Sequence, residues 1–165
     1  MIARVESCLL QGIDAGPCEI EVDLDDRGLE RQTIVGLPDA AVKESLERVR
    51  AALGNSGYPF PLGRCLINLA PADVRKEGPV YDLPIALGLL LAQGVLRGDA
   101  DGLDPRRCVV VGELALDGRV RPVKGAIAMA AMARQRGMSA FICPKDNAGE
   151  AAVVGGVDVF GVRTI

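Results

Sequence analysis

The sequence contains no histidine among its 165 residues. Histidine is the commonest general base and metal ligand in proteins, so its absence excludes a Ser-His-Asp triad and a histidine-based metal centre. A serine–lysine dyad remains as a nucleophilic arrangement. Serine is scarce, however: the chain has only Ser7, Ser45, Ser56 and Ser139. None of them lies in a predicted strand-to-helix loop beside a lysine.

Two other motifs are missing. No G-x-x-x-x-G-K-[ST] pattern occurs, so we expect no phosphate-binding loop and no cofactor in this chain. The five cysteines never form a C-x-x-C pair, which excludes zinc spacing and predicts no metal site. Such scattered cysteines in apolar runs predict free, buried thiols and a cytoplasmic protein.

No signal peptide or membrane span is expected either. The longest uncharged, mainly apolar run, 83–96, is too short to cross a bilayer. The net charge of −3 gives the chain no strong positive field for nucleic acid as a whole. With 49% hydrophobic and 25% charged residues, the chain predicts one folded domain with a sizeable core.

The order of predicted elements indicates a two-layer α/β domain with a mixed sheet. Alternating apolar and acidic residues over 18–25 predict a half-buried strand, paired with 3–10 through a turn at 14–17. Apolar residues spaced from Val42 to Leu53 predict a helix capped by Asp39. Further strands are expected at 32–35, 65–69, 108–111, 140–143 and 157–160, a hairpin at 113–120, and helices at 82–91, 126–135 and 147–153.

One loop resembles a protease active-site loop. A strand ending near Leu69 runs into a Pro- and Gly-rich loop and then into an apolar helix, and the loop reads Lys76-Glu77-Gly78-Pro79-Val80-Tyr81-Asp82. It is similar to the K-D/E-G-P-S-A-G loop of Lon-type proteases, in which the serine is the nucleophile. Val80 stands at the serine position, and a valine side chain has no lone pair for attack.

A second segment resembles the region that carries the lysine of the Lon dyad. Residues 112–127 follow the pattern G-E-x-x-L-x-G-x-V-x-P-I-G-G-x-K closely as far as Pro122. The lysine position falls on Ile127, and Lys124, about one helical turn earlier, is a weak substitute. The resemblance therefore implies a Lon-protease-domain-like architecture, a fold similar to the second domain of a ribosomal protein. It also implies that both catalytic positions are replaced in this chain, by Val80 and Ile127.

A closer resemblance covers nearly the whole chain. The motifs that carry this resemblance lie at residues 35–39, 41–44, 48–52, 55–58, 68–73, 76–86 and 112–118. By these motifs the chain is identified as a member of the YifB/ComM family, the magnesium-chelatase-subunit-ChlI-like AAA+ ATPases of bacteria.

This resemblance implies that residues 1–165 form a single Lon-like N-terminal domain and that the ATPase module, with ATP and Mg²⁺, belongs to a longer protein. It implies other subunits of an AAA+ ring as partners, DNA as a further partner, and no membrane. The full-length protein would be a ring-forming helicase in natural transformation and recombination, with this domain as a non-catalytic assembly or DNA-guiding module. The alternatives are a protein-partner module of a chelatase-type ATPase, and a degenerate peptidase using Lys124 or Lys76.

Basic residues surround the two loops that resemble the protease. If the two loops meet, these basic residues would form an anion- or DNA-binding face, because phosphate contacts use Lys and Arg. The alternative is that they are solvated loop charges paired with Asp73, Glu77 and Asp82. The residues are Arg64, Arg75, Lys76, Arg119, Arg121 and Lys124, of which Arg75, Lys76, Arg119, Arg121 and Lys124 form the candidate site.

Overall fold

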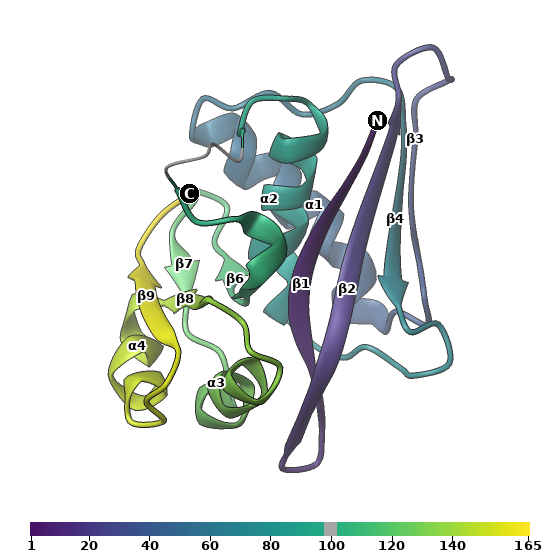
Figure 1. Cartoon of the computed structure of the whole chain (residues 1–165). Helices are drawn as coiled ribbons and strands as arrows, with labels where there is room; N and C mark the ends of the chain where they lie inside the picture. The colour runs from purple at the N-terminus through teal and green to yellow at the C-terminus, as the bar shows by residue number, and fades with distance from the viewer. Residues whose placement is uncertain (98–101) are drawn as a thin grey trace.

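The computed structural model describes residues 1–97 and 102–165. These residues form an α/β fold with four α-helices, a seven-stranded mixed sheet and a small two-stranded sheet (Figure 1). The helices are α1 (Ala40–Asn55), α2 (Asp82–Ala92), α3 (Ala126–Gln135) and α4 (Lys145–Ala152). The strands are β1 (Ile2–Gln11), β2 (Asp14–Asp25), β3 (Arg31–Val35), β4 (Arg64–Ala70), β5 (Cys108–Val110), β6 (Glu113–Leu114), β7 (Val120–Arg121), β8 (Ala140–Pro144) and β9 (Asp158–Val162).

The large sheet has the strand order β3-β4-β2-β1-β5-β8-β9, and β6 pairs with β7 apart from it. β2 is antiparallel to both of its neighbours, β1 and β4, whereas all other neighbouring pairs in the sheet run parallel. Strands β1, β3 and β4 therefore point the same way, and the loops that follow them gather at one end of the sheet (Figure 1). The predicted mixed sheet is confirmed.

The predicted turn of the first hairpin is wrong. The chain turns at Gly12 and Ile13, and 14–17 already belongs to β2, with Gln11 opposite Asp14. Gly12 has φ +65°, a conformation that glycine adopts without a steric penalty. Pro17 is tolerated in the strand because the pairing of β2 with β4 begins only at Glu19, so its missing N–H faces no neighbour on that side.

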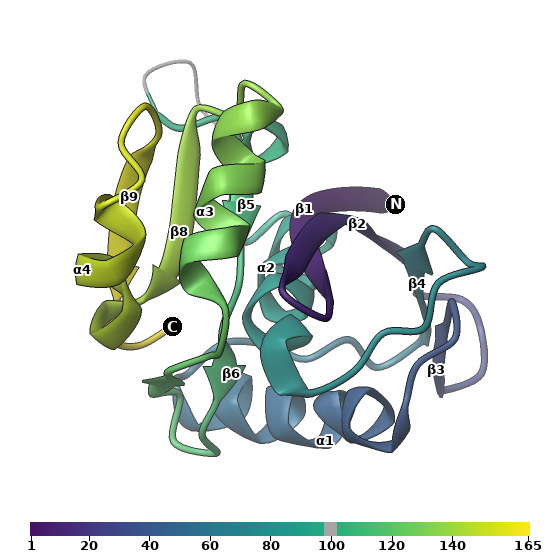
Figure 2. The same ribbon diagram turned by 90° about the horizontal axis from the view of Figure 1, so that it is seen from below.

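The predicted two-layer arrangement holds for only half of the sheet. Helices α1 and α2 cover one face, where they bury Val5, Ile20 and Ile67. Helices α3 and α4 cover the opposite face over β5 and β8, where they bury Val109 and Phe141 (Figure 2). Strands that are apolar on both faces, such as the run at 108–111, need cover on both, which explains the third layer.

A buried carboxylate and a partly buried arginine connect the helices to the small sheet. The Asp82 carboxylate accepts bonds from Arg48 Nε at 2.7 Å and Nη2 at 3.0 Å, and also from the backbone N–H of Leu114 at 3.1 Å. Asp82 is fully buried, at the first residue of α2. This network fixes α1, α2 and β6 to one another.

No helix of the described residues is long and apolar enough to cross a membrane.

Candidate functional site

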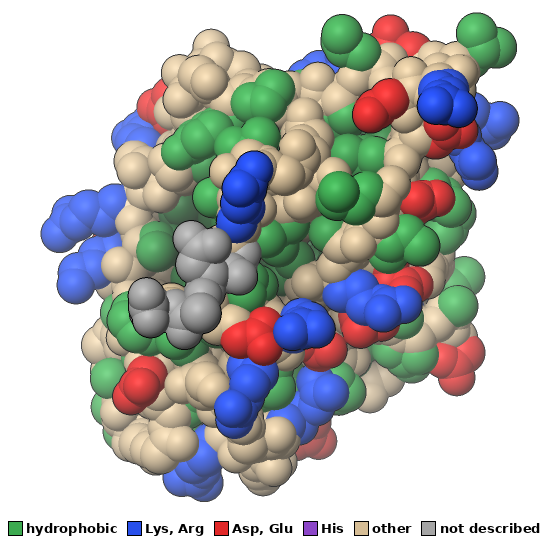
Figure 3. Space-filling model, turned by 45° about the horizontal axis from the view of Figure 1, so that its top comes forward, with side chains coloured by type: hydrophobic (Ala, Val, Ile, Leu, Met, Phe, Trp, Pro, Cys, Tyr) green, Lys and Arg blue, Asp and Glu red, His purple; other side chains and the backbone are tan. Residues whose placement is uncertain are grey.

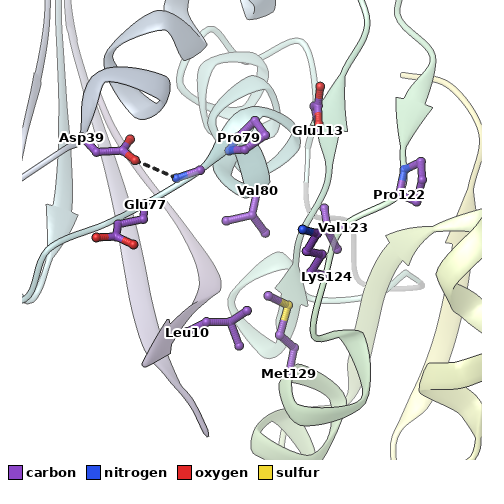
Figure 4. Close-up of a pocket in the computed structure, with 11 residues that line it drawn as sticks. Leu10, Asp39, Glu77, Pro79, Val80, Glu113, Pro122, Val123, Lys124 and Met129 are labelled. Atoms are coloured by element: carbon purple, nitrogen blue, oxygen red, sulfur yellow. Dashed lines mark hydrogen bonds between the residues drawn. The ribbon is translucent and has the colours of Figure 1, made fainter. Parts of the chain in front are cut away.

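A cavity of about 540 Å³ opens where the two protease-like segments meet. Its walls come from the tip of β1, the loop between β4 and α2, and the segment between β7 and α3 (Figure 4). Most of its floor is apolar, and charged side chains stand at its rim. The lining residues are Leu10, Asp39, Glu77, Gly78, Pro79, Val80, Glu113, Pro122, Val123, Lys124 and Met129.

One wall is fixed by Asp39. Its Oδ1 accepts the backbone N–H of Val42 at 2.8 Å and caps α1, while its Oδ2 accepts the N–H of Gly78 at 3.1 Å (Figure 4). Gly78 has φ +80°, so the loop needs glycine at this point. The predicted cap at Asp39 is confirmed, and the same carboxylate also holds the loop that carries Val80.

The opposite wall is fixed by Asn147. This buried side chain of α4 accepts the N–H of Val123 at 2.9 Å and donates to the carbonyl of Val123 at 2.9 Å. Its amide nitrogen also donates to Glu150 at 2.6 Å. Because both walls are held by hydrogen bonds from other elements, the cavity is formed before any ligand arrives.

The two positions that the sequence resemblance assigns to a protease dyad, Val80 and Ile127, differ in their surroundings. Val80 lines the cavity, with Lys124 on the facing wall (Figure 4). Ile127 does not line it: its side chain is half exposed on the first turn of α3, and α3 contributes Met129 instead.

No serine lines the cavity. Ser7 is buried in β1 and donates to the carbonyl of Val110 at 2.8 Å, and Ser45 is buried in α1, where it accepts from Arg48 at 3.2 Å. Both hydroxyls therefore have structural partners. The cavity offers an apolar surface with charged groups at its rim, and no nucleophile of the serine type.

The structure places the candidate cations in three kinds of environment. Arg75, Arg119 and Arg121 are exposed, and each lies near a carboxylate: Glu77 at 3.5 Å, Asp117 at 2.8 Å and Glu113 at 3.9 Å. Lys124 is exposed at the cavity rim.

Lys76 differs from the other four because its side chain is fully buried. Its Nζ donates to the carbonyl of Pro71, and burial lowers the pKa of its ammonium group. A buried ammonium does not meet an anion at the surface.

Arg64 lies apart from all of these residues. It starts β4, a strand of seven residues, whereas the protease-like loop follows the other end of that strand. At about 3.3 Å per residue the two ends are roughly 20 Å apart. An anion site at the remaining residues stays a prediction, but it would have to compete with the neighbouring carboxylates.

Two residues that organise the cavity were not identified from the sequence. Asp39 was expected only as a helix cap, and its bond to Gly78 spans 39 positions. Asn147 was expected only as part of a helix, and its bonds to Val123 span 24 positions. No local pattern signals either long-range contact. Among residues 1–97 and 102–165, no three Cys, Asp or Glu side chains cluster as metal ligands.

Comparison with known proteins places the chain in the Mg-chelatase subunit ChlI family, whose model, described as "Subunit ChlI of Mg-chelatase", matches residues 20–147. It is 47% identical to the YifB protein of Escherichia coli over 145 residues, covering 88% of this chain and 28% of that protein. It is 42% identical to the competence protein ComM of Haemophilus influenzae, and equally to a Mycobacterium tuberculosis protein, in each case over 99% of this chain. The chain spans about a third of the length of these relatives.

Proposed function

We propose that this chain is a non-catalytic, Lon-like N-terminal domain of a YifB/ComM-type AAA+ ATPase and that it serves ring assembly. The observation that carries the proposal is the cavity at Val80: its walls are held in place, yet it contains an apolar side chain where a peptidase needs a nucleophile. A site that keeps its shape without the reacting group is suited to binding. The ATPase context is part of the proposal: it follows from the resemblance to AAA+ ATPases and is compatible with membership of the ChlI family.

ATP and Mg²⁺ would bind in the ATPase module of the full-length protein. The sequence of this chain has no phosphate-binding loop, and the relatives are about three times as long. One relative is named as a competence protein, which supports a role in DNA uptake or recombination for the full-length protein.

Assembly is favoured over DNA guiding by the charges around the cavity. Each of the three exposed arginines in the candidate set lies within 4 Å of a carboxylate, and Lys76 is buried. Phosphate binding gains most from cations that can replace the counterions of the nucleic acid, and paired cations are less available for this.

A charge-reversal pair tests this choice in the full-length protein. Arg119→Glu with Lys124→Glu should leave DNA affinity and its salt dependence unchanged if the domain serves assembly. The matched control is Arg106→Glu with Arg107→Glu, an exposed pair in the short helix 105–107. A loss of affinity confined to the first pair, with a shallower salt slope, would assign DNA guiding to the domain.

A further inference from the structure

Strand β1 loses one of its two neighbours halfway along its length. It pairs with β2 from end to end, but in the described part of the chain its pairing with β5 is limited to Glu6 opposite Val109. One residue further on, the Ser7 hydroxyl donates to the carbonyl of Val110 at 2.8 Å, at the last residue of β5. Beyond this point β1 has an open edge, which we define as residues 8–11 on the side facing away from β2.

The backbone groups of Cys8 and Leu10 point towards this open edge. The Met1 ammonium donates to the carbonyl of Leu24 at 2.8 Å, and the N–H of Leu24 donates to the carbonyl of Met1 at 3.1 Å. From that bonded pair the register of β1 and β2 runs on without a bulge. Because bonded pairs alternate in an antiparallel ladder, odd-numbered residues of β1 bond to β2 and even-numbered residues point away from it.

The space beside the open edge is the cavity. After β5 the chain turns to the loop before α2, where the N–H of Gly112 donates to the carbonyl of Val80 at 3.0 Å. Leu10 and Val80 both line the cavity, and Figure 4 shows both side chains directed into it. The cavity therefore occupies the place that a further strand beside β1 would take.

The open edge selects an extended peptide as the ligand. N–H and C=O groups spaced along a strand match the main chain of another strand, which is the basis of recognition by strand addition. At about 3.3 Å per residue, residues 8–11 offer room for about four residues of a ligand. The loop before α2 and the segment before α3 enclose this edge, so it admits a single extended chain and not the edge of a second folded sheet.

The floor of the cavity adds a preference for an apolar side chain. A ligand residue opposite Leu10 would place its side chain on the same face as that of Leu10, beside Met129 and Val80. Apolar side chains elsewhere on the surface lie scattered among charged and other residues, as the face in Figure 3 shows. Scattered apolar residues need no partner, whereas an apolar floor inside a cavity is typical of a binding site.

Lys124 adds a preference for an acidic residue in the ligand. The three carboxylates of the lining already have partners: Asp39 accepts two backbone N–H groups, and Glu77 and Glu113 lie 3.5 Å and 3.9 Å from arginine side chains. Within the described residues, Lys124 has no carboxylate within 4.0 Å. A carboxylate of the ligand would give this rim lysine an ion-pair partner.

We propose that the cavity binds an extended peptide segment of a partner protein, which adds a strand to β1 at Leu10. An apolar side chain of the segment lies against Val80 and Met129, and an acidic side chain two residues away meets Lys124. The proposal rests on the non-catalytic role given to the cavity above and names what the cavity holds. The enclosed edge argues against a second folded copy as the occupant, and the carboxylates of the lining argue against nucleic acid.

Short peptides test the proposal on the 165-residue chain. The probes are the acetylated and amidated pentapeptides TVTDT and TDTVT, which place the acid on either side of the apolar residue. At least one of them should bind with a Kd below about 1 mM in an NMR titration and should slow amide exchange at Leu10. The lysine versions TVTKT and TKTVT should bind about threefold to fivefold more weakly, the effect of an exposed ion pair.

Two substitutions assign the binding to the cavity. Lys124→Glu should reverse the preference between the acidic and the lysine peptides, whereas Arg27→Glu, an exposed residue between β2 and β3, should leave it unchanged. Val80→Glu should abolish binding because it puts a charge on the apolar floor, and Val153→Glu, which is 80% exposed in the wild type, is its matched control. Lys124 is exposed, so its replacement remains informative even if Val80→Glu fails to fold.

Methylation of the peptide backbone tests strand addition itself. Alternate amides of a strand face opposite sides, so N-methyl groups on one alternate set should abolish binding, and on the other set should leave the Kd within about twofold. This contrast is expected whichever direction the peptide takes along β1.

Four results would overturn the proposal. They are the absence of binding by all four peptides up to about 1 mM, an equal loss of binding for both methylated sets, binding that neither cavity substitution changes, and protection of Leu10 that rises with protein concentration in the absence of peptide. The last result would assign the cavity to a second copy. If the full-length protein needs residues 1–165 to form rings but no peptide binds, the assembly function stands and this proposal is wrong. Peptide binding by a domain that rings do not need would have the opposite meaning.

Discussion

The carboxylate of Asp39 joins the start of α1 to the loop that carries Val80. Its two oxygens accept from different segments, Val42 N at 2.8 Å and Gly78 N at 3.1 Å. One side chain therefore stabilises a helix end and fixes one wall of the cavity.

Asp39→Ala should lower the free energy of unfolding by about 1–2 kcal/mol, the usual cost of losing a helix cap. Amide exchange at Gly78 should also become faster, because its N–H loses its partner. Urea unfolding and hydrogen exchange measure the two effects. Asp104→Ala is the control, since Asp104 caps only the short helix 105–107. Unchanged exchange at Gly78 in Asp39→Ala would contradict the double role.

Arg48→Ala should lower the free energy of unfolding by about 3–5 kcal/mol, more than Asp39→Ala does. The reason is that it leaves the buried Asp82 carboxylate without its ion-pair partner. Glu44→Ala is the matched control: it removes the other carboxylate near Arg48, an exposed one at 3.7 Å, and should cost less than about 1 kcal/mol. Chemical denaturation of both variants gives the comparison. Equal costs would mean that the buried pair has no special part in the fold.

The native chain should not react with a serine-directed fluorophosphonate probe. Ser7 and Ser45 are buried and hydrogen-bonded, and no serine lines the cavity. Mass spectrometry after labelling, with an active serine hydrolase as positive control, reads out the result. Labelling of any of the four serines in the folded chain would revive the degenerate-peptidase alternative.

Stability should fall at alkaline pH because of the buried thiols. Burial raises the pKa of Cys18 to about 12 and the pKa values of Cys65 and Cys143 to about 11. In the unfolded chain these thiols ionise near the ordinary pKa of about 8.5. The buried thiols therefore make their full contribution to the free energy of unfolding below about pH 8.5. This contribution is lost as the pH rises towards 11, and each thiol lowers the free energy of unfolding by up to about 1.4 kcal/mol per pH unit.

Urea unfolding at pH 8 and pH 10 measures this loss, and Cys65→Ala isolates one thiol. The slope of the unfolding free energy against pH should be smaller in the variant by up to about 1.4 kcal/mol per unit. An identical slope in variant and wild type would show that Cys65 ionises as easily in the folded chain as in the unfolded one.

Much of the fold could be predicted because its signals are local. The stripe from Val42 to Leu53 and the alternation in β2 match the observed helix and strand. The third layer was missed because the sequence does not say which element covers the second face of β5 and β8. The first turn was misplaced because Asp14-Ala15-Gly16-Pro17 has turn composition, while Gly12 alone supplied the required positive φ.

The site could be predicted only in part. The two motifs located both walls of the cavity, and Val80 lines it. Burial of Lys76 could not be inferred, because its neighbours in sequence are charged and its cover comes from other elements. The contacts made by Asp39 and Asn147 across the chain depend on the folded structure alone.

The most direct test of the account is the mass of the complex that the full-length protein forms with ATP, measured with and without residues 1–165. Assembly as the function of this domain predicts rings for the intact protein and a shift to monomers or incomplete assemblies for the truncated one, with the ATPase module still folded. Rings of the same mass and the same concentration dependence in both proteins would contradict it.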